Sequence, residues 1–103
     1  MASFRGENVY PTNIKTARIP YTVTSNDVSN GDAAIAWTIS PPFPDNKYTA
    51  SMTVESITGS TQNVYPECVT ISGNTVTAYV GVYNAGDTII VHFMAIHDFG
   101  LLP

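Results

Sequence analysis

The residues that could carry chemistry in this chain are one cysteine, Cys68, and two histidines, His92 and His97. A cysteine nucleophile needs a base such as histidine within hydrogen-bond reach and a third group that orients the base. The residues around Cys68 are Pro-Glu-Cys-Val, which match no nucleophile motif. A lone cysteine beside a strand is usually a small packing residue. The sequence therefore predicts no catalytic nucleophile.

The two histidines also make a poor metal site. They stand five positions apart in a segment with the composition of a β-strand, so their side chains should point to opposite faces. His97 and Asp98 could contribute ligands where several copies meet on an axis, but hydrogen-bonded groups at the end of a strand are the favoured interpretation. Three further acids stand beside asparagine or glycine, where aspartate stabilises turns: Asp32, Asp45 and Asp87. We expect no catalytic residue, no cofactor and no metal, and a protein that is not an enzyme.

The composition indicates a folded domain with an unusually neutral surface. The chain has 103 residues, which fits one domain, and 44% of them are apolar. Only 12% are charged, against roughly 25% in average soluble domains. Such a surface suits contact with other proteins, because aromatic residues are enriched and most charged residues depleted at the cores of interfaces.

The few charges are unevenly distributed along the chain, which has a net charge of −4. All four cations lie within the first 47 positions: Arg5, Lys15, Arg18 and Lys47. Nucleic-acid binding normally needs a basic patch, and this chain offers none. We expect no signal peptide and no membrane partner, because the chain starts without an apolar core and its apolar stretches are shorter than the roughly 20 residues of a membrane helix.

The first part of the chain shows no clear period and is interrupted by glycine and proline. We expect an extended N-terminal arm at residues 1–20, followed by the folded domain at residues 21–103. The arm is either a solvated tail or a segment that docks on an acidic partner surface. In the second case its partner-binding residues are the apolar and basic ones, Phe4, Arg5, Tyr10, Lys15 and Arg18.

From Tyr21 onward the pattern is that of short strands separated by turns. Apolar and polar residues alternate, as in strands with one buried face, and no apolar period of helical length occurs. The predicted strands are 21–25, 33–40, 47–57, 68–72, 75–83 and 88–97. Gly73-Asn74 has the chemistry of a two-residue hairpin turn, and residues 26–32 have that of a loop. The fold class is therefore all-β, a single antiparallel β-sandwich of about six to eight strands.

The last predicted strand is apolar on both faces. One face carries alternate residues from Ile89 to Ala95, and the other carries Ile90, His92, Met94 and Ile96. A strand that is apolar on both sides is normally covered on both sides, which is difficult in so small a domain. We therefore predict self-association through the second face.

The segment 39–54, ISPPFPDNKYTASMTV, resembles small β-sandwich knob domains of bacteriophage tail fibres and the H-type lectins. In those domains a strand leads into a Pro-Phe-Pro-Asp corner and then into a strand that begins with tyrosine. The second half is also similar, because it ends in a closing strand with an Ala-Ile pair at Ala95-Ile96. The resemblance implies a homotrimer. No sugar-binding residue carries over, and His97-Asp98 replaces the tryptophan often found at the end of the closing strand.

The chain has no fibre shaft, so we expect a free-standing knob in the virion, assembled in the host cytoplasm. The expected function is that of a capsid decoration or cement protein, a non-enzymatic structural protein that trimerises and binds the major capsid protein. The alternative is the receptor- or glycan-binding tip of a tail fibre. In that case exposed aromatics would stack on sugar rings, although they are equally well explained as ordinary sheet-surface residues: Tyr65, Tyr79 and Tyr83.

Overall fold

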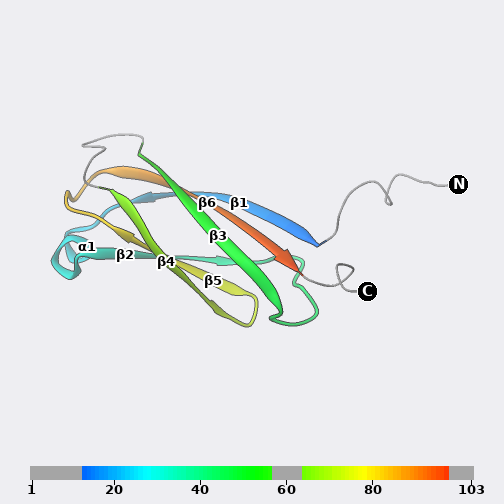
Figure 1. Cartoon of the computed structure of the whole chain (residues 1–103). Coiled ribbons are helices and arrows are strands. Elements are labelled where there is room, and N and C mark those ends of the chain that lie inside the picture. The colour runs from blue at the N-terminus through cyan, green and yellow to red at the C-terminus, as the bar shows by residue number, and fades with distance from the viewer. Residues whose placement is uncertain (1–12, 57–63, 98–103) are drawn as a thin grey trace, which may run out of the picture.

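The computed structural model describes residues 13–56 and 64–97, and it confirms the all-β sandwich (Figure 1). Within these residues, six strands form two three-stranded antiparallel sheets. Sheet I has the order β1-β6-β3, and its strands are Ile14–Thr22, Thr88–His97 and Tyr48–Ser56. Sheet II has the order β2-β5-β4, and its strands are Asp32–Thr38, Thr75–Gly81 and Tyr65–Ser72.

Strand β1 changes the predicted boundary between the arm and the sandwich. The sequence pattern predicts an irregular arm as far as residue 20, but residues 14–20 form an edge strand that pairs with β6 along its whole length, so this part of the prediction was wrong. Ala17 and Ile19 pack against the core. The two-residue period of this strand is hard to see in the sequence because Lys15, Arg18 and Pro20 interrupt it. Pro20 is compatible with the strand because β1 lies at the edge of its sheet. Residues 1–12 of the predicted arm lie outside the described residues.

The loop predicted between the first two strands contains a short helix, α1 (Ser25–Asn30). The Thr24 hydroxyl accepts a hydrogen bond from the Asp27 N–H at 3.2 Å, and the Asp27 carboxylate accepts one from the Thr24 N–H at 2.9 Å. This reciprocal capping box satisfies donors that the first turn leaves open. Gly31 ends the helix with a left-handed φ of 86°. Tyr21 Oη donates to Asp27 Oδ2 at 2.6 Å, which ties the helix to β1.

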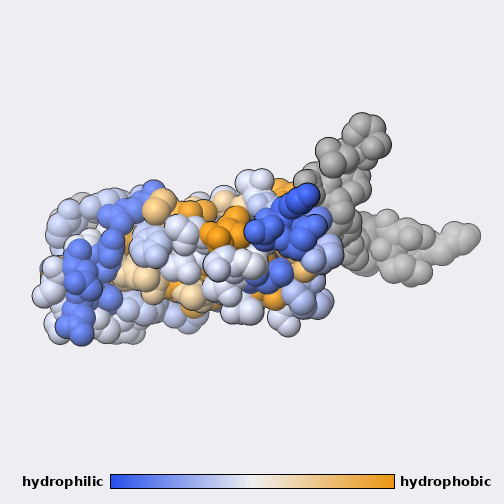
Figure 2. Space-filling model, turned by 90° about the horizontal axis from the view of Figure 1, so that it is seen from below, coloured by the Kyte–Doolittle hydropathy of each residue, from blue (hydrophilic) through white to orange (hydrophobic). Residues whose placement is uncertain are grey.

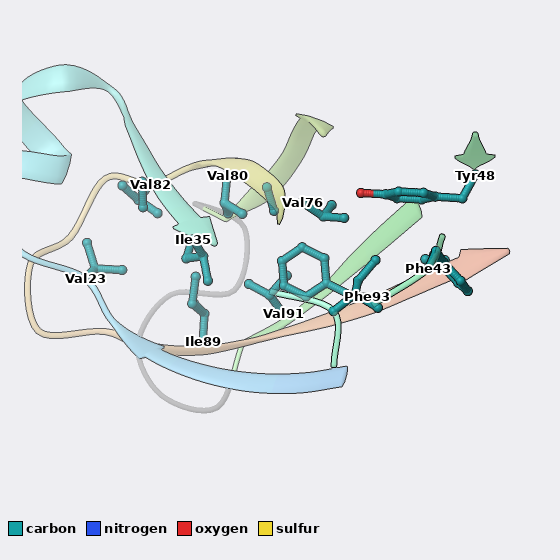
Figure 3. Packing of buried hydrophobic residues seen from close by; sticks show 14 residues of the cluster. Val23, Ile35, Phe43, Tyr48, Val76, Val80, Val82, Ile89, Val91 and Phe93 are labelled. Carbon is teal, nitrogen blue, oxygen red and sulfur yellow. The ribbon is translucent and has the colours of Figure 1, made fainter. Parts of the chain in front are cut away.

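The core lies between the two sheets and is built mainly by their central strands, β5 and β6 (Figure 3). The fully inward side chains of these two strands are Val76, Ala78, Val80, Ile89, Val91, Phe93 and Ala95. Trp37 of β2 closes the core from sheet II, with its ring centroid 5.4 Å from that of Phe93. The alternation predicted for these strands is confirmed, and it determines which side chains are left on the outer faces.

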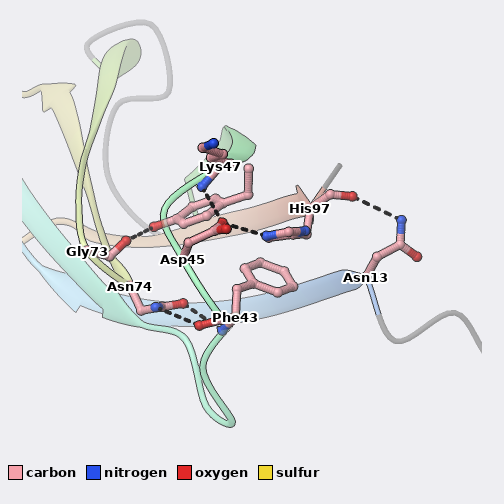
Figure 4. A network of polar contacts seen from close by, with 8 residues as sticks. Asn13, Phe43, Asp45, Lys47, Gly73, Asn74 and His97 are labelled. Carbon is pink, nitrogen blue, oxygen red and sulfur yellow. Dashed lines mark hydrogen bonds and ion pairs between the residues drawn. The ribbon is translucent and has the colours of Figure 1, made fainter. Parts of the chain in front are cut away.

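A proline-rich corner, residues 39–47, carries the chain from sheet II to sheet I and is attached to the turn between β4 and β5 (Figure 4). Asn74 Oδ1 accepts a hydrogen bond from the Phe43 N–H at 2.8 Å, and Asn74 Nδ2 donates to the Phe43 carbonyl at 3.2 Å. Tyr48 Oη donates to the Gly73 carbonyl at 2.8 Å. The predicted Gly73-Asn74 turn is therefore present, and it also positions the start of β3.

His97 completes this corner from the end of β6. Its buried ring places Nε2 2.7 Å from Asp45 Oδ1, and the ring centroid lies 5.1 Å from that of Phe43. Asp45 Oδ1 also accepts a hydrogen bond from the Lys47 N–H at 2.9 Å. The Lys47 N–H, followed by the His97 ring, lowers the pKa of Asp45. His97 is thus a hydrogen-bonded residue at the end of a strand, as the favoured interpretation has it, and Asp98 lies outside the described residues.

Candidate functional site

The outer face of sheet I is the first candidate site, and β6 runs along its midline between β1 and β3. Ile90, His92, Met94 and Ile96 share the register of this face, as the alternation predicts, but Ile90 is only 4% exposed and is therefore already covered in the single chain, whereas His92 and Ile96 are partly exposed. Met94 is 44% exposed. Ile14 of β1 lies opposite Ile96 and is 42% exposed, so it extends the apolar surface at the end of the face where Ile96 lies.

A shallow hollow of about 430 Å³ lies on this face and is formed by all three strands of sheet I. Its outward-facing lining consists of Thr16 and Arg18 from β1, Ser51 and Thr53 from β3, and His92 and Met94 from β6. The flanking strands contribute mainly small hydroxyl side chains, which are lower than the longer side chains of β6. The hollow therefore combines Met94 on the midline with mostly small hydroxyl side chains on the borders, and among the described residues Arg18 and His92 are its only ionisable outward-facing ones.

Opposite charges flank the midline of this face. His92 Nε2 lies 3.0 Å from Glu55 Oε1, and the two side chains are 39% and 49% exposed. An exposed pair of this kind contributes about 0–1 kcal/mol to stability. Arg18 lies opposite His92 on the other flank, in β1. Arg18 and Glu55 therefore place opposite charges on the two flanks of this face, one on β1 and one on β3.

The residues predicted to bind a partner through the arm do not form one described surface. Arg18 lies on the outer face of sheet I, whereas Lys15 Nζ lies 5.6 Å from the centroid of the Phe43 ring at the corner. Phe4, Arg5 and Tyr10 lie outside the described residues. The role of the arm stays a prediction.

Two residues of this face, Ile14 and Glu55, were missing from the predicted self-association surface. The alternation of segment 47–57 already indicates that Glu55 shares a face with Thr53, but nothing local indicates that this face lies beside β6. Ile14 was missed because its strand was taken for part of the arm. Long-range pairing, which places Glu55 opposite Ile90 and Ile14 opposite Ile96, is what brings them together.

The residues singled out for their chemistry are dispersed. Cys68 is exposed on β4 of sheet II, whereas His92 and His97 lie on opposite faces of sheet I, as predicted. Among residues 13–56 and 64–97, no three His, Cys, Asp or Glu side chains are grouped so that they could hold a metal ion. The same residues contain no helix of the length and hydropathy that a membrane crossing requires.

The surface seen from below the view of Figure 1 has its strongly hydrophilic groups at the two ends of the body, with weakly polar and apolar surface between them (Figure 2). One of these ends carries α1.

No protein-family model, curated protein or solved structure matches this chain. Its function is therefore inferred from the chemistry of its surfaces and from the resemblance of the segment 39–54.

Proposed function

We propose that this protein is a non-enzymatic structural protein of a bacteriophage virion. In this role it is a capsid decoration or cement protein that forms a homotrimer and binds the shell of the major capsid protein. The observation that carries the proposal is the apolar outer face of β6, with Met94 exposed at its centre. The resemblance of the segment 39–54 to trimeric phage knob domains supports the phage assignment and the number of copies.

Self-association has a physical reason in the shape of sheet I. A sheet of three strands has one central strand, and here that strand leaves Met94 exposed and Ile96 partly exposed on its outer side. Complete burial of a methionine or isoleucine side chain contributes about 1.5–3 kcal/mol relative to full exposure. Met94 and Ile14 are each a little under half exposed, so covering them would contribute about 1 kcal/mol per side chain in each copy.

The assembly is tested by light scattering of the purified protein and of Met94→Asp. Met94 is more than half buried in the single chain, so the aspartate should lower the stability of the fold by about 1–2 kcal/mol, and it places an unpaired charge in the interface. We expect a trimer for the unaltered protein and a folded monomer for Met94→Asp. Thr70→Asp, on the exposed outer side of β4, is the matched control and should remain trimeric. A stable monomer of the unaltered protein at micromolar concentration would refute self-association.

Binding to the capsid is tested separately, by cosedimentation with empty shells of the major capsid protein from the same phage. Deletion of residues 1–12 leaves β1 intact, whereas a deletion that also removed residues 14–18 would destroy the first part of this strand. We expect the deleted protein to remain a trimer and to lose its binding to the shells. Undiminished binding after the deletion would exclude the arm as the docking segment, and a trimer that never binds shells would refute the decoration role.

A further inference from the structure

Two exposed tyrosines lie together at one end of sheet II. Tyr65 begins β4 and Tyr83 follows β5, and their ring centroids are 6.2 Å apart, with 3.5 Å between the hydroxyl oxygens. Tyr65 is 42% exposed and Tyr83 is 54% exposed. Tyr79, the third tyrosine considered for sugar stacking, is partly buried on β5 opposite Cys68. The first two tyrosines therefore form an aromatic surface that faces solvent.

Gly81 makes room for one of these rings. It lies opposite Tyr65 on one side and opposite Asp32 on the other, so the three residues form a row across sheet II. A Cβ atom on Gly81 would collide with the Tyr65 ring, which shows that this ring lies directly over the glycine. An aromatic ring that covers a glycine on the neighbouring strand helps to stabilise a sheet. This role accounts for Tyr65, but it does not account for the exposed Tyr83 beside it.

Two carboxyl groups lie next to the aromatic pair. The register of β4 shifts between Pro66 and Cys68, and Glu67 at this shift lies within reach of Asp32. Glu67 is exposed, and partial desolvation, followed by the charge of Asp32 and a hydrogen bond with it, raises the pKa of Glu67. Neighbouring carboxylates repel each other, so this arrangement is not explained by stability.

No cation compensates these carboxyl groups in the described part of the chain. The basic side chains there belong to other regions: Lys15 and Arg18 to β1, and Lys47 to the corner before β3. A ligand that carries phosphate, carboxylate or sulfate would therefore meet only negative charge at this end of sheet II. A neutral ligand with hydroxyl groups would meet acceptors.

We propose that Tyr65, Tyr83, Asp32 and Glu67 form a binding site for a neutral hexose unit of a glycan. A pyranose ring has an apolar face of C–H groups, which is attracted to the electron-rich face of a tyrosine ring. Its hydroxyl groups are donors, and carboxylates are acceptors with several free lone pairs. The site is independent of the outer face of sheet I, so it goes beyond the proposed decoration role and does not require it.

The test is a titration of the ¹⁵N-labelled protein with glucose, galactose, mannose, N-acetylglucosamine and glucuronic acid, followed by NMR. For a ligand of hexose size on an open surface we expect a dissociation constant of about 1 mM for at least one neutral sugar. The amide shifts should be confined to the row from Asp32 through Gly81 to Tyr65 and to its neighbours Glu67 and Tyr83. Glucuronic acid should bind more weakly than glucose.

Two variants and one control make the result specific. Gly81→Ala should displace the Tyr65 ring, and Tyr83→Ala removes the second ring at an exposed position outside the strands. Each should weaken sugar binding at least tenfold while circular dichroism shows a folded protein; if Gly81→Ala does not fold, Tyr83→Ala alone decides. Thr70→Ala, on the same sheet but away from the row, should bind sugar unchanged, and so should the monomeric Met94→Asp. The proposal is overturned if no sugar binds saturably, if glucuronic acid binds most tightly, or if Tyr83→Ala binds as well as the unaltered protein.

Discussion

Replacement of Asn74 by alanine tests whether the turn between β4 and β5 holds the proline-rich corner in place. The Asn74 side chain makes both a donated and an accepted hydrogen bond with the backbone of Phe43, at 3.2 Å and 2.8 Å. Phe43 is buried, and its ring packs 5.2 Å from that of Tyr48 at the start of β3. Asn74→Ala removes both bonds but keeps the backbone bond from the Ile39 N–H to the Asn74 carbonyl at 2.9 Å.

The expected loss follows from these two bonds. Each intramolecular hydrogen bond contributes about 1 kcal/mol net, and a partly buried backbone group left without a partner costs about 1–3 kcal/mol. Water can reach part of the corner, because Asp45, two residues after Phe43, is exposed. We therefore expect Asn74→Ala to lower the free energy of unfolding by about 2–3 kcal/mol, a large share of the roughly 5–15 kcal/mol of a typical domain.

Urea denaturation at fixed protein concentration measures this loss. With an m-value of about 1–2 kcal/mol/M for a chain of this size, the midpoint should fall by about 1–3 M while the m-value stays unchanged. Asn46→Ala, an exposed asparagine of the same corner, is the control and should stay within about 0.5 kcal/mol of the unaltered protein. If both substitutions have the same small effect, solvent replaces the two bonds and the turn does not stabilise the corner.

Two further predictions concern pH and the helix cap. The Lys47 N–H and the His97 ring hold the pKa of Asp45 below its ordinary value of 3.8, so the stability from this carboxylate is complete above that pH and is lost as the pH falls through the lower folded-state pKa. Thermal melts of Asp45→Asn from neutral pH to about pH 2 should show a weaker acid dependence than those of the unaltered protein, and equal slopes would contradict this role. Thr24→Ala removes the N-cap of α1 and should cost about 1 kcal/mol in urea denaturation, whereas the exposed Ser29→Ala should cost less.

Much of the strand pattern was predictable because it is local. The outward set of β6 residues follows from alternation alone. The turn at Gly73-Asn74, whose first residue has a φ of 60°, follows from its residue types. The first part of strand β1, up to residue 20, was missed because basic side chains and Pro20 interrupt its alternation. Helix α1 was missed because its six residues are too few to show a helical period.

The sequence by itself determined which side chains of a strand share a face, because the two-residue period of a strand depends only on the local backbone. The choice of neighbouring strands was decided only by the tertiary structure, because pairing depends on how the whole sandwich closes over its core. That closure places Glu55 beside His92, attaches the proline-rich corner to Asn74, and brings Tyr83 to Tyr65. The surfaces on which both proposals rest are therefore products of long-range pairing, although each contributing side chain can be assigned to its face from the sequence.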